Sequence, residues 1–150
     1  MKQVDFPLYV FHHGKNFRAY DFFGSHPDKV DGTKGYVFRV WAPHAETVSV
    51  VGDFNEWDPS AHVMKRLLDG ESFELFVPGI KEYTIYKYCI QTSDGRFLYK
   101  ADPYAFHAET PSKTASKTYS LDGFRWSDRD YLKAKQKKSI YSSPVNIYEM

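Results

Sequence analysis

Short runs of alternating apolar and polar residues, each stopped by a glycine or proline turn, constrain the fold of this chain more than any other feature. From Gly35 the period of alternation is two, so Tyr36, Phe38 and Val40 fall on one face of an extended segment. The same criteria predict strands over residues 36–41, 47–51, 73–77, 83–91, 96–99 and 114–121. Short strands at this spacing, without a helical repeat, predict an all-β fold, an immunoglobulin-like antiparallel β-sandwich.

The segments on either side of these strands differ in character. The first residues have one potential helical turn and several rings within Phe17–Phe23 before glycine and proline interrupt any long element. After the strands, the S-x-x-D pattern of Ser127 to Asp130 predicts a short helix over residues 129–138. We therefore expect an irregular N-terminal arm (1–34), the sandwich module (35–122), a linker helix (123–143), and an unpartnered strand (144–150) that begins a domain absent from this chain.

Composition favours recognition of a neutral partner. Aromatic residues make up 18% of the 150 residues, more than a small core usually needs, so some rings should be exposed. The formal net charge of +1 disfavours a nucleic-acid or membrane-surface role, and the lysines of residues 133–138 fit a solvated helix better. One cysteine, Cys89, sits in an apolar run and cannot form an intrachain disulfide. Because the chain has no signal-like segment either, we expect a cytoplasmic protein.

No residue pattern indicates catalysis. Glycoside cleavage uses two carboxylates roughly 5 to 9 Å apart across a cleft. Asp53, Glu56 and Asp58 lie instead on one short turn, where carboxylates ordinarily bond their own backbone. The six histidines lack metal-ligand spacing, and the common nucleotide and hydrolase motifs do not occur. We therefore predict no catalytic residues, no metal and no cofactor.

A binding face can be built from four positions instead. Trp57 follows a strand on a polar loop, Lys87 interrupts an aromatic strand, and Phe97 returns beside it after the turn at residues 93–95; Asn55 could supply a further donor. Flat rings with flanking donors match a sugar, which has apolar C–H faces and a rim of hydroxyls. In the alternative interpretation, Trp57 and Phe97 pack under loops and Lys87 extends from an exposed sheet face.

Several of these motifs also carry a resemblance. The segment from Gly35 to Asp58, with Y-K-Y at Tyr86–Tyr88 and D-P-Y-A-F at Asp102–Phe106, resembles the family-48 carbohydrate-binding modules of starch and glycogen enzymes. R-A-Y-D-F-F-G-S-H-P at Arg18–Pro27 and P-V-N-I-Y-E-M at Pro144–Met150 are similar to the N-terminal part of bacterial-type 1,4-α-glucan branching enzymes, in glycoside hydrolase family 13.

The resemblance implies a module that precedes a catalytic (β/α)-barrel, with residues 145–150 as the first barrel strand. Such an enzyme cuts an α-1,4-glucan and rejoins the piece through an α-1,6 bond, and its catalytic carboxylates would lie on barrel strands outside this chain. The implied partners are an α-glucan and the barrel. From the residues alone, the apolar side chains of Phe17–Phe23 and Ile140–Met150 have no evident partner, and we expect them to be mobile or buried against another copy. A related debranching or trehalose-forming enzyme and a free-standing glycogen-binding scaffold remain as alternatives.

The same resemblance bears on the sugar-binding positions. In related glycogen-binding modules of the energy-sensing kinase, two tryptophans, a lysine and an asparagine hold the glucan. Trp57 and Lys87 match the first tryptophan and the lysine, and Phe97 stands in place of the second tryptophan. The asparagine has no counterpart in Ser116–Thr118.

Overall fold

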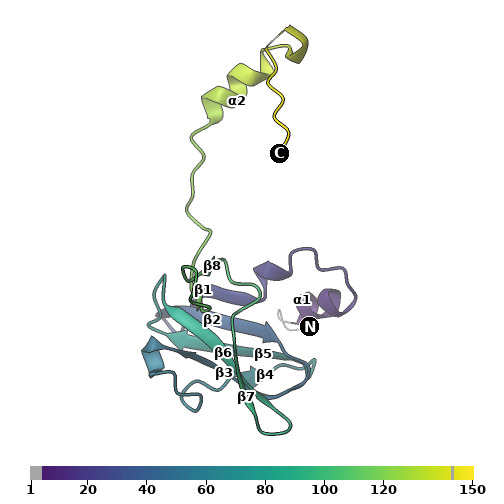
Figure 1. Ribbon diagram of the computed structural model, residues 1–150. Helices are drawn as coiled ribbons and strands as arrows, with labels where there is room; N and C mark the ends of the chain where they lie inside the picture. Colours follow the sequence, from purple (N-terminus) through teal and green to yellow (C-terminus); the bar gives the residue numbers. More distant parts are fainter. Residues whose placement is uncertain (1–4, 143) are drawn as a thin grey trace. The chain divides into compact units, whose positions relative to one another are not determined.

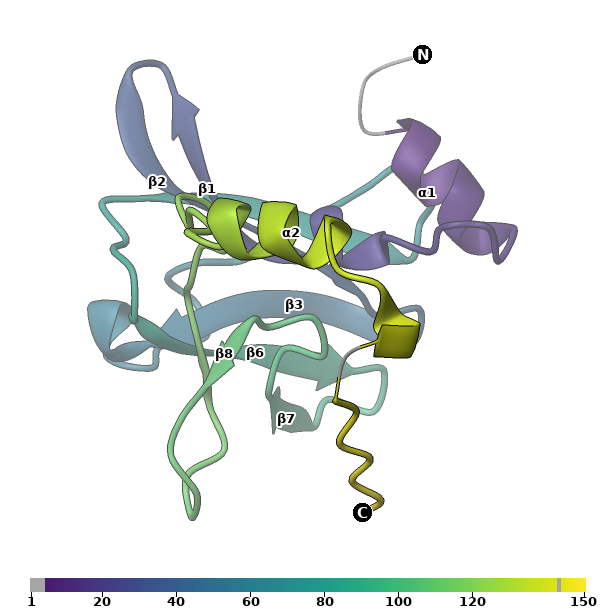
Figure 2. The ribbon, with the colours of Figure 1, turned by 90° about the horizontal axis from the view of Figure 1, so that it is seen from above.

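The computed structural model describes residues 5–142 and 144–150 of the chain, which divide into two compact units, Met1–Ser120 and Leu121–Met150. The first unit contains two antiparallel β-sheets that face each other (Figures 1 and 2). In Figure 2, β1 and β2 lie in one layer and β3 and β6 in the other. This arrangement confirms the all-β, immunoglobulin-like sandwich.

The first sheet has the strand order β1-β2-β5-β4. Its strands are β1 (Gly24–Val30), β2 (Thr33–Trp41), β5 (Ser72–Pro78) and β4 (Lys65–Arg66). The pairing of β2 with β5 runs from Gly35↔Pro78 to Trp41↔Ser72. The prediction for residues 36–41 and 73–77 is confirmed.

The second sheet is organised around β6 (Ile85–Thr92). Along one edge β6 pairs with β3 (Ala45–Gly52) over almost its full length. Along the other edge β9 (Ser116–Lys117) pairs with the first residues of β6, and β7 (Phe97–Lys100) pairs with its second half. Strand β8 (His107–Ala108) then pairs with β9. The long predicted strand 114–121 was therefore wrong in length, and β8 was not predicted, because both strands are too short to show a period.

The core lies between the two sheets and is built from the predicted alternation. Tyr36, Phe38 and Val40 of β2 are buried there as expected. The ring centroid of Phe38 lies 4.9 Å from that of Tyr86 in an edge-to-face contact. The remaining buried residues of this cluster are Ala45, Val48, Val50, Met64, Phe73, Val77 and Tyr88.

The arm is more regular than expected. Helix α1 (Asp5–His12) and the 3₁₀ turn η1 (Ala19–Asp21) precede β1, which is the edge strand of the first sheet. Strand β1 was not predicted, because Gly24 and Pro27 ordinarily interrupt regular elements. Proline is tolerated on an edge strand, where its missing N–H is not needed by a neighbour. Gly24 has φ +102°, and a Cβ there would lie 2.9 Å from the Tyr104 carbonyl oxygen.

The rings of the arm pack against the same unit. Leu8, Phe22 and Phe23 form a second buried cluster, against which Leu67 and Tyr104 pack. Phe11 meets Trp41 edge-to-face at 5.7 Å, and Phe22 lies under the Arg39 guanidinium at 4.7 Å. Arg39 and Trp41 alternate with the core residues of β2, so the arm covers the outer face of the first sheet. The expectation that the rings of 17–23 are mobile or buried against another copy is therefore wrong for Phe22 and Phe23, which are buried within this unit, whereas Phe17 is 90% exposed.

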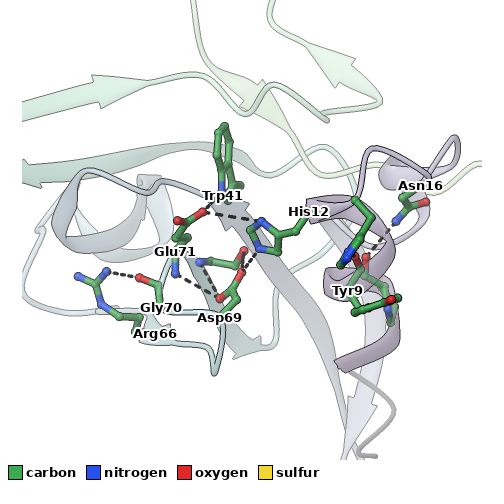
Figure 3. Close-up of polar contacts among 11 residues, drawn as sticks. Tyr9, His12, Asn16, Trp41, Arg66, Asp69, Gly70 and Glu71 are labelled. Atoms are coloured by element: carbon green, nitrogen blue, oxygen red, sulfur yellow. Dashed lines mark hydrogen bonds and ion pairs between the residues drawn. The ribbon is translucent and has the colours of Figure 1, made fainter.

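A polar contact fixes α1 to the turn between β4 and β5 (Figure 3). His12 Nε2 lies 3.0 Å from an Asp69 carboxylate oxygen, which also accepts the Ser72 hydroxyl at 2.6 Å. The Trp41 indole N–H donates to Glu71 at 2.9 Å, and His12 Nδ1 lies 3.8 Å from the same carboxylate. Burial disfavours ionised Asp69, but hydrogen bonds from Ser72 and His12 outweigh it, so the pKa of Asp69 lies below its ordinary value.

The second unit contains α2 (Arg129–Gln136) and the 3₁₀ turn η3 (Ile140–Ser142). Helix α2 confirms most of the helix predicted over residues 129–138. Residues 137 and 138 lie beyond its end. Residues 144–150 have no regular secondary structure. Since a strand needs a neighbour for its backbone hydrogen bonds, the assignment of this segment as a barrel strand stays a prediction.

Candidate functional site

The outward side of the second sheet carries two of the four predicted binding residues, Lys87 and Phe97. Tyr86 and Tyr88 of β6 point into the core, so the alternate residues Ile85, Lys87, Cys89 and Gln91 point to the other side. Residues paired with these four share that side, which we call the outer face. The arm covers the corresponding side of the first sheet, so the two sheets differ in what they leave open.

Trp57 lies on the loop after β3. The 3₁₀ turn η2 (Asp53–Asn55) is followed by Glu56 and Trp57, with φ of 54° and 61°. The left-handed region is unfavourable for such residues by roughly 1–2 kcal/mol each, so the surrounding contacts must hold them there. The Trp57 indole N–H donates to Asp53 at 2.8 Å and its backbone N–H to Gly52 at 3.0 Å. The half-buried ring is thereby oriented.

Asn55 forms hydrogen bonds within the loop that carries Trp57. Its carbonyl oxygen accepts the Gly52 N–H at 2.9 Å. Its amide nitrogen donates to the Val50 carbonyl at 3.0 Å and lies 2.9 Å from His62 Nδ1. These contacts shape the loop that presents Trp57, and a sugar hydroxyl would have to displace one of them. A direct sugar contact by Asn55 stays a prediction.

Lys87 and Phe97 share the outer face. Lys87 pairs with Val51 of β3, and its ammonium donates to the Thr114 hydroxyl at 2.8 Å. Phe97 pairs with Gln91, which is four residues beyond Lys87, and its side chain is 52% exposed. Four residues of an extended strand span about 13 Å. The fold thus places both on one surface without direct contact between them.

Tyr99 lies between Lys87 and Phe97 along the outer face. No pattern in the sequence singled it out. It pairs with Cys89, two residues from Lys87 and two from Gln91, and is 47% exposed. An interaction with the Cys89 thiol, and to a smaller extent the charge of Asp58, raises the pKa of Tyr99. Asp58 belongs to the loop that carries Trp57. Only the β6–β7 register reveals this position, although Tyr99 follows Phe97 by two residues, the spacing of one strand face.

The carboxylates of the loop serve its own geometry. Asp53 accepts the Trp57 indole N–H, and Asp58 accepts both the backbone N–H and the hydroxyl of Ser60 at 2.8 and 2.7 Å. The Ser60 bonds lower the pKa of Asp58. Asp58 therefore bonds the backbone of its own turn, as the sequence suggested, whereas Asp53 orients the Trp57 ring. Within residues 5–142 and 144–150, no group of three His, Cys, Asp or Glu side chains could hold a metal ion.

Helices of the described part of the chain are short, and none of them is sufficiently long and apolar to cross a membrane.

Comparison with known proteins bears on the identity of this fold. Residues 22–105 match the family described as carbohydrate-binding module 48 (isoamylase N-terminal domain). The 1,4-alpha-glucan branching enzyme of Bacillus subtilis (strain 168) is 48% identical over 143 residues, which are 95% of this chain and 23% of that enzyme. The 1,4-alpha-glucan branching enzyme of Butyrivibrio fibrisolvens is 47% identical over 141 residues, 94% of this chain and 22% of that enzyme. The chain thus spans less than a quarter of the length of these curated relatives.

Solved structures share the fold at lower identity. A putative alpha amylase from Salmonella typhimurium superposes with a TM-score of 0.55 at 22% identity, over 73% of this chain and 17% of that chain. Pullulanase from Bacillus acidopullulyticus gives a TM-score of 0.52 at 25% identity, over 71% of this chain and 13% of that chain.

Proposed function

Because the chain belongs to the carbohydrate-binding module 48 family, we propose that it is the non-catalytic N-terminal module of a 1,4-alpha-glucan branching enzyme. One observation carries the proposal: identity to branching enzymes of 44–48% extends over 93–95% of the chain, well beyond the segment that defines the family. Identity to a pullulanase is much lower, at 25%. This difference favours a branching enzyme over the related debranching or trehalose-forming enzymes.

The parent protein would transfer an α-1,4-glucan segment to an α-1,6 branch point in glycogen synthesis. In this proposal the catalytic carboxylates belong to the remainder of the parent chain, because the acidic residues of the Trp57 loop are engaged in turns. We accordingly expect the 150-residue chain to show no branching activity in an iodine-staining assay. Branching by this chain alone would contradict the assignment of Asp53 and Asp58 as turn residues.

The module itself would bind α-glucan on the outer face of the second sheet. Trp57, Tyr99 and Phe97 offer rings to the apolar face of a sugar, and the Lys87 ammonium offers a donor to its hydroxyls. The net charge of the chain is only +1, which suits a neutral polysaccharide as the partner.

Affinity electrophoresis through gels that contain glycogen tests this role. We expect glycogen to retard the wild-type chain, and Trp57→Ala to restore most of the mobility. The matched control is Phe17→Ala, which removes an exposed ring from the arm and should leave retardation unchanged. Equal mobility of wild type and Trp57→Ala at every glycogen concentration would exclude sugar binding by this face.

The module would also brace the catalytic barrel of its parent. Support comes from the apolar side chains that the arm leaves exposed, Phe6, Tyr9 and Phe17, since contiguous exposed apolar surface often marks an interface. In a chain without the barrel, the same side chains could meet a second copy. A cytoplasmic location completes the proposal, and the buried free thiol of Cys89 is in keeping with a reducing compartment.

A further inference from the structure

Three rings gather at the far end of the outer face, away from Phe97. Tyr83, His107 and Tyr119 lie with each pair of ring centroids 5.5 Å apart. Tyr83 is 55% exposed, and the other two are half-buried. We call these three residues the ring cluster. It belongs to neither the core between the sheets nor the cluster under the arm.

Strand register places the ring cluster on the same side as Lys87. Lys117 pairs with Ile85 on one side and with His107 on the other, so these three residues face outward together. Thr118 is fully buried, and its neighbour Tyr119 therefore points back to the outer face. The cluster and the proposed sugar-binding residues thus form one continuous surface.

The backbone at Tyr83 is held in an unfavourable conformation. Its φ is 64°, and a bulky residue in this region costs roughly 1–3 kcal/mol unless neighbouring contacts fix it. Thr118 supplies those contacts: its carbonyl accepts the Tyr83 N–H at 2.7 Å, and its hydroxyl accepts the Thr84 N–H at 3.0 Å and donates to the Lys81 carbonyl at 2.7 Å. Strain of this kind is concentrated at ligand-binding positions, and here it keeps the Tyr83 ring at the surface.

Lys87 lies between two aromatic surfaces. Gln91, the partner of Phe97, follows it by four residues of β6, which correspond to about 13 Å of extended chain. In the other direction Ile85, the partner of Lys117, precedes it by two residues, and Tyr83 lies in the turn before β6. A ligand that lay along β6 would meet rings at both ends and an ammonium in the middle.

The ring cluster also offers polar groups suited to hydroxyls. His107 Nδ1 lies 2.8 Å from the Ala108 carbonyl, which can only accept, so the proton is assigned to Nδ1 and Nε2 remains an acceptor. The tyrosine hydroxyls both donate and accept. Burial, together with the neighbouring Tyr119, raises the pKa of Tyr83 and keeps its hydroxyl protonated as a donor.

We propose that the ring cluster is a second contact surface for the same α-glucan chain, so that the outer face prefers long linear glucans to short ones. This inference rests on the proposed function, because it takes sugar binding at Trp57 as given. A long glucan would contact Phe97, Lys87 and the ring cluster together, whereas a short one would cover only part of this row. The ring cluster would add affinity only for a glucan that is long enough to cover it.

Titration calorimetry with maltotriose and maltoheptaose tests the inference on the full chain. Tyr83→Gly is the informative variant, because glycine accepts φ 64° without strain and only the ring is lost. Loss of one ring contact should weaken maltoheptaose binding roughly 2- to 10-fold and leave maltotriose binding unchanged. Tyr119→Ala should act in the same direction, and thermal unfolding verifies that both variants fold.

Two controls separate this inference from the proposed function. Trp57→Ala should weaken both sugars, and Phe17→Ala neither. If Trp57→Ala weakens both sugars while Tyr83→Gly leaves maltoheptaose affinity unchanged, the second contact surface is refuted and the proposed function stands. Equal weakening of the two sugars by Tyr83→Gly also refutes it. If the wild-type chain binds neither sugar, both the proposed sugar-binding function and this inference are refuted.

Discussion

At the scale of single residues, Asp102 is the most constrained side chain of the sandwich. Its carboxylate accepts the hydroxyls of Tyr86 at 2.6 Å and Tyr88 at 3.1 Å, and the backbone N–H of Tyr104 at 2.8 Å. Burial nevertheless dominates and raises the pKa of Asp102, and it raises the pKa of both tyrosines well above the ordinary value. One acceptor thus satisfies three buried donors and ties β6 to the segment after β7.

We predict that Asp102→Asn destabilises the chain by about 1–3 kcal/mol near neutral pH, because the new amide turns a donor toward one of these three donors. Urea unfolding measures the change, with the exposed Glu46→Gln as control. The raised pKa adds a pH dependence: the folded chain takes up a proton before the unfolded one. The wild-type advantage should therefore grow as pH falls through that pKa toward 3.8. A constant difference across this range would contradict the prediction.

Only some residues of the candidate site could be predicted from the sequence. Trp57 and Lys87 stand out because each breaks a local pattern, and Phe97 because it follows a recognisable turn. Tyr99 and the ring cluster become neighbours of Lys87 only through pairing between strands, which the sequence of one strand does not encode. The role of Asn55 also depended on bonds to Val50 and His62 that no spacing rule predicts.

At the scale of elements, the alternation of apolar and polar residues predicted the strands that supply the core. It did not predict strands that form because of their pairing or their place in the sheet. Strands β8 and β9 are each two residues long and are defined by pairing alone. Strand β1 contains glycine and proline, and its place at a sheet edge makes them acceptable. The arm was expected to be irregular, but α1 and Phe23 are fixed by contacts with Leu67, Asp69 and Tyr104.

The contact between α1 and the β4–β5 turn gives a prediction for the arm. His12→Ala should raise amide hydrogen exchange in residues 5–12 and leave the β4–β5 turn protected, because Asp69 keeps its bonds to Ser72. His13→Ala is the matched control, since His13 bonds to Tyr9 of its own helix. Unchanged exchange in α1 of the His12 variant would show that apolar packing alone holds the arm.

Acid should release the same contact. The folded pKa of Asp69 is lowered, so its contribution to stability is present above the unfolded value near 3.8 and is lost as pH falls through the folded pKa. Exchange in α1 should therefore rise below about pH 3.8 in the wild-type chain. Asp69→Ala should already exchange fast at neutral pH and show no such step.

At the scale of the whole molecule, the outward sides of the two sheets differ in what covers them. The arm covers one with Phe11 and Phe22, and the other presents the half-exposed rings of Phe97 and Tyr99 on β7. The family relationship and the sandwich were both within reach of the sequence, because motifs such as Gly35–Asp58 are local. The difference between the two outward sides could not be predicted from the sequence, because it follows from the tertiary packing of residues 5–23.

The exposed side of the arm predicts weak self-association. Light scattering of the 150-residue chain should show an apparent mass that rises with concentration, and Phe17→Ser should reduce the rise because it removes a side chain that is 90% exposed. Val63→Ser, which alters an exposed apolar residue near β3, should have no effect. A constant monomer mass over the whole range would oppose the prediction.

The position of Cys89 gives the chain a built-in chemical probe. It is the sole thiol, 2% exposed, on the outer face directly opposite Tyr99, and burial raises its pKa. A thiol-reactive reagent therefore needs a local opening of Tyr99 before it can react. A glucan that rests on Tyr99 would slow that opening, so the labelling rate of Cys89 should fall as the sugar concentration rises. Occupancy of this face could then be measured by mass spectrometry without any engineered label.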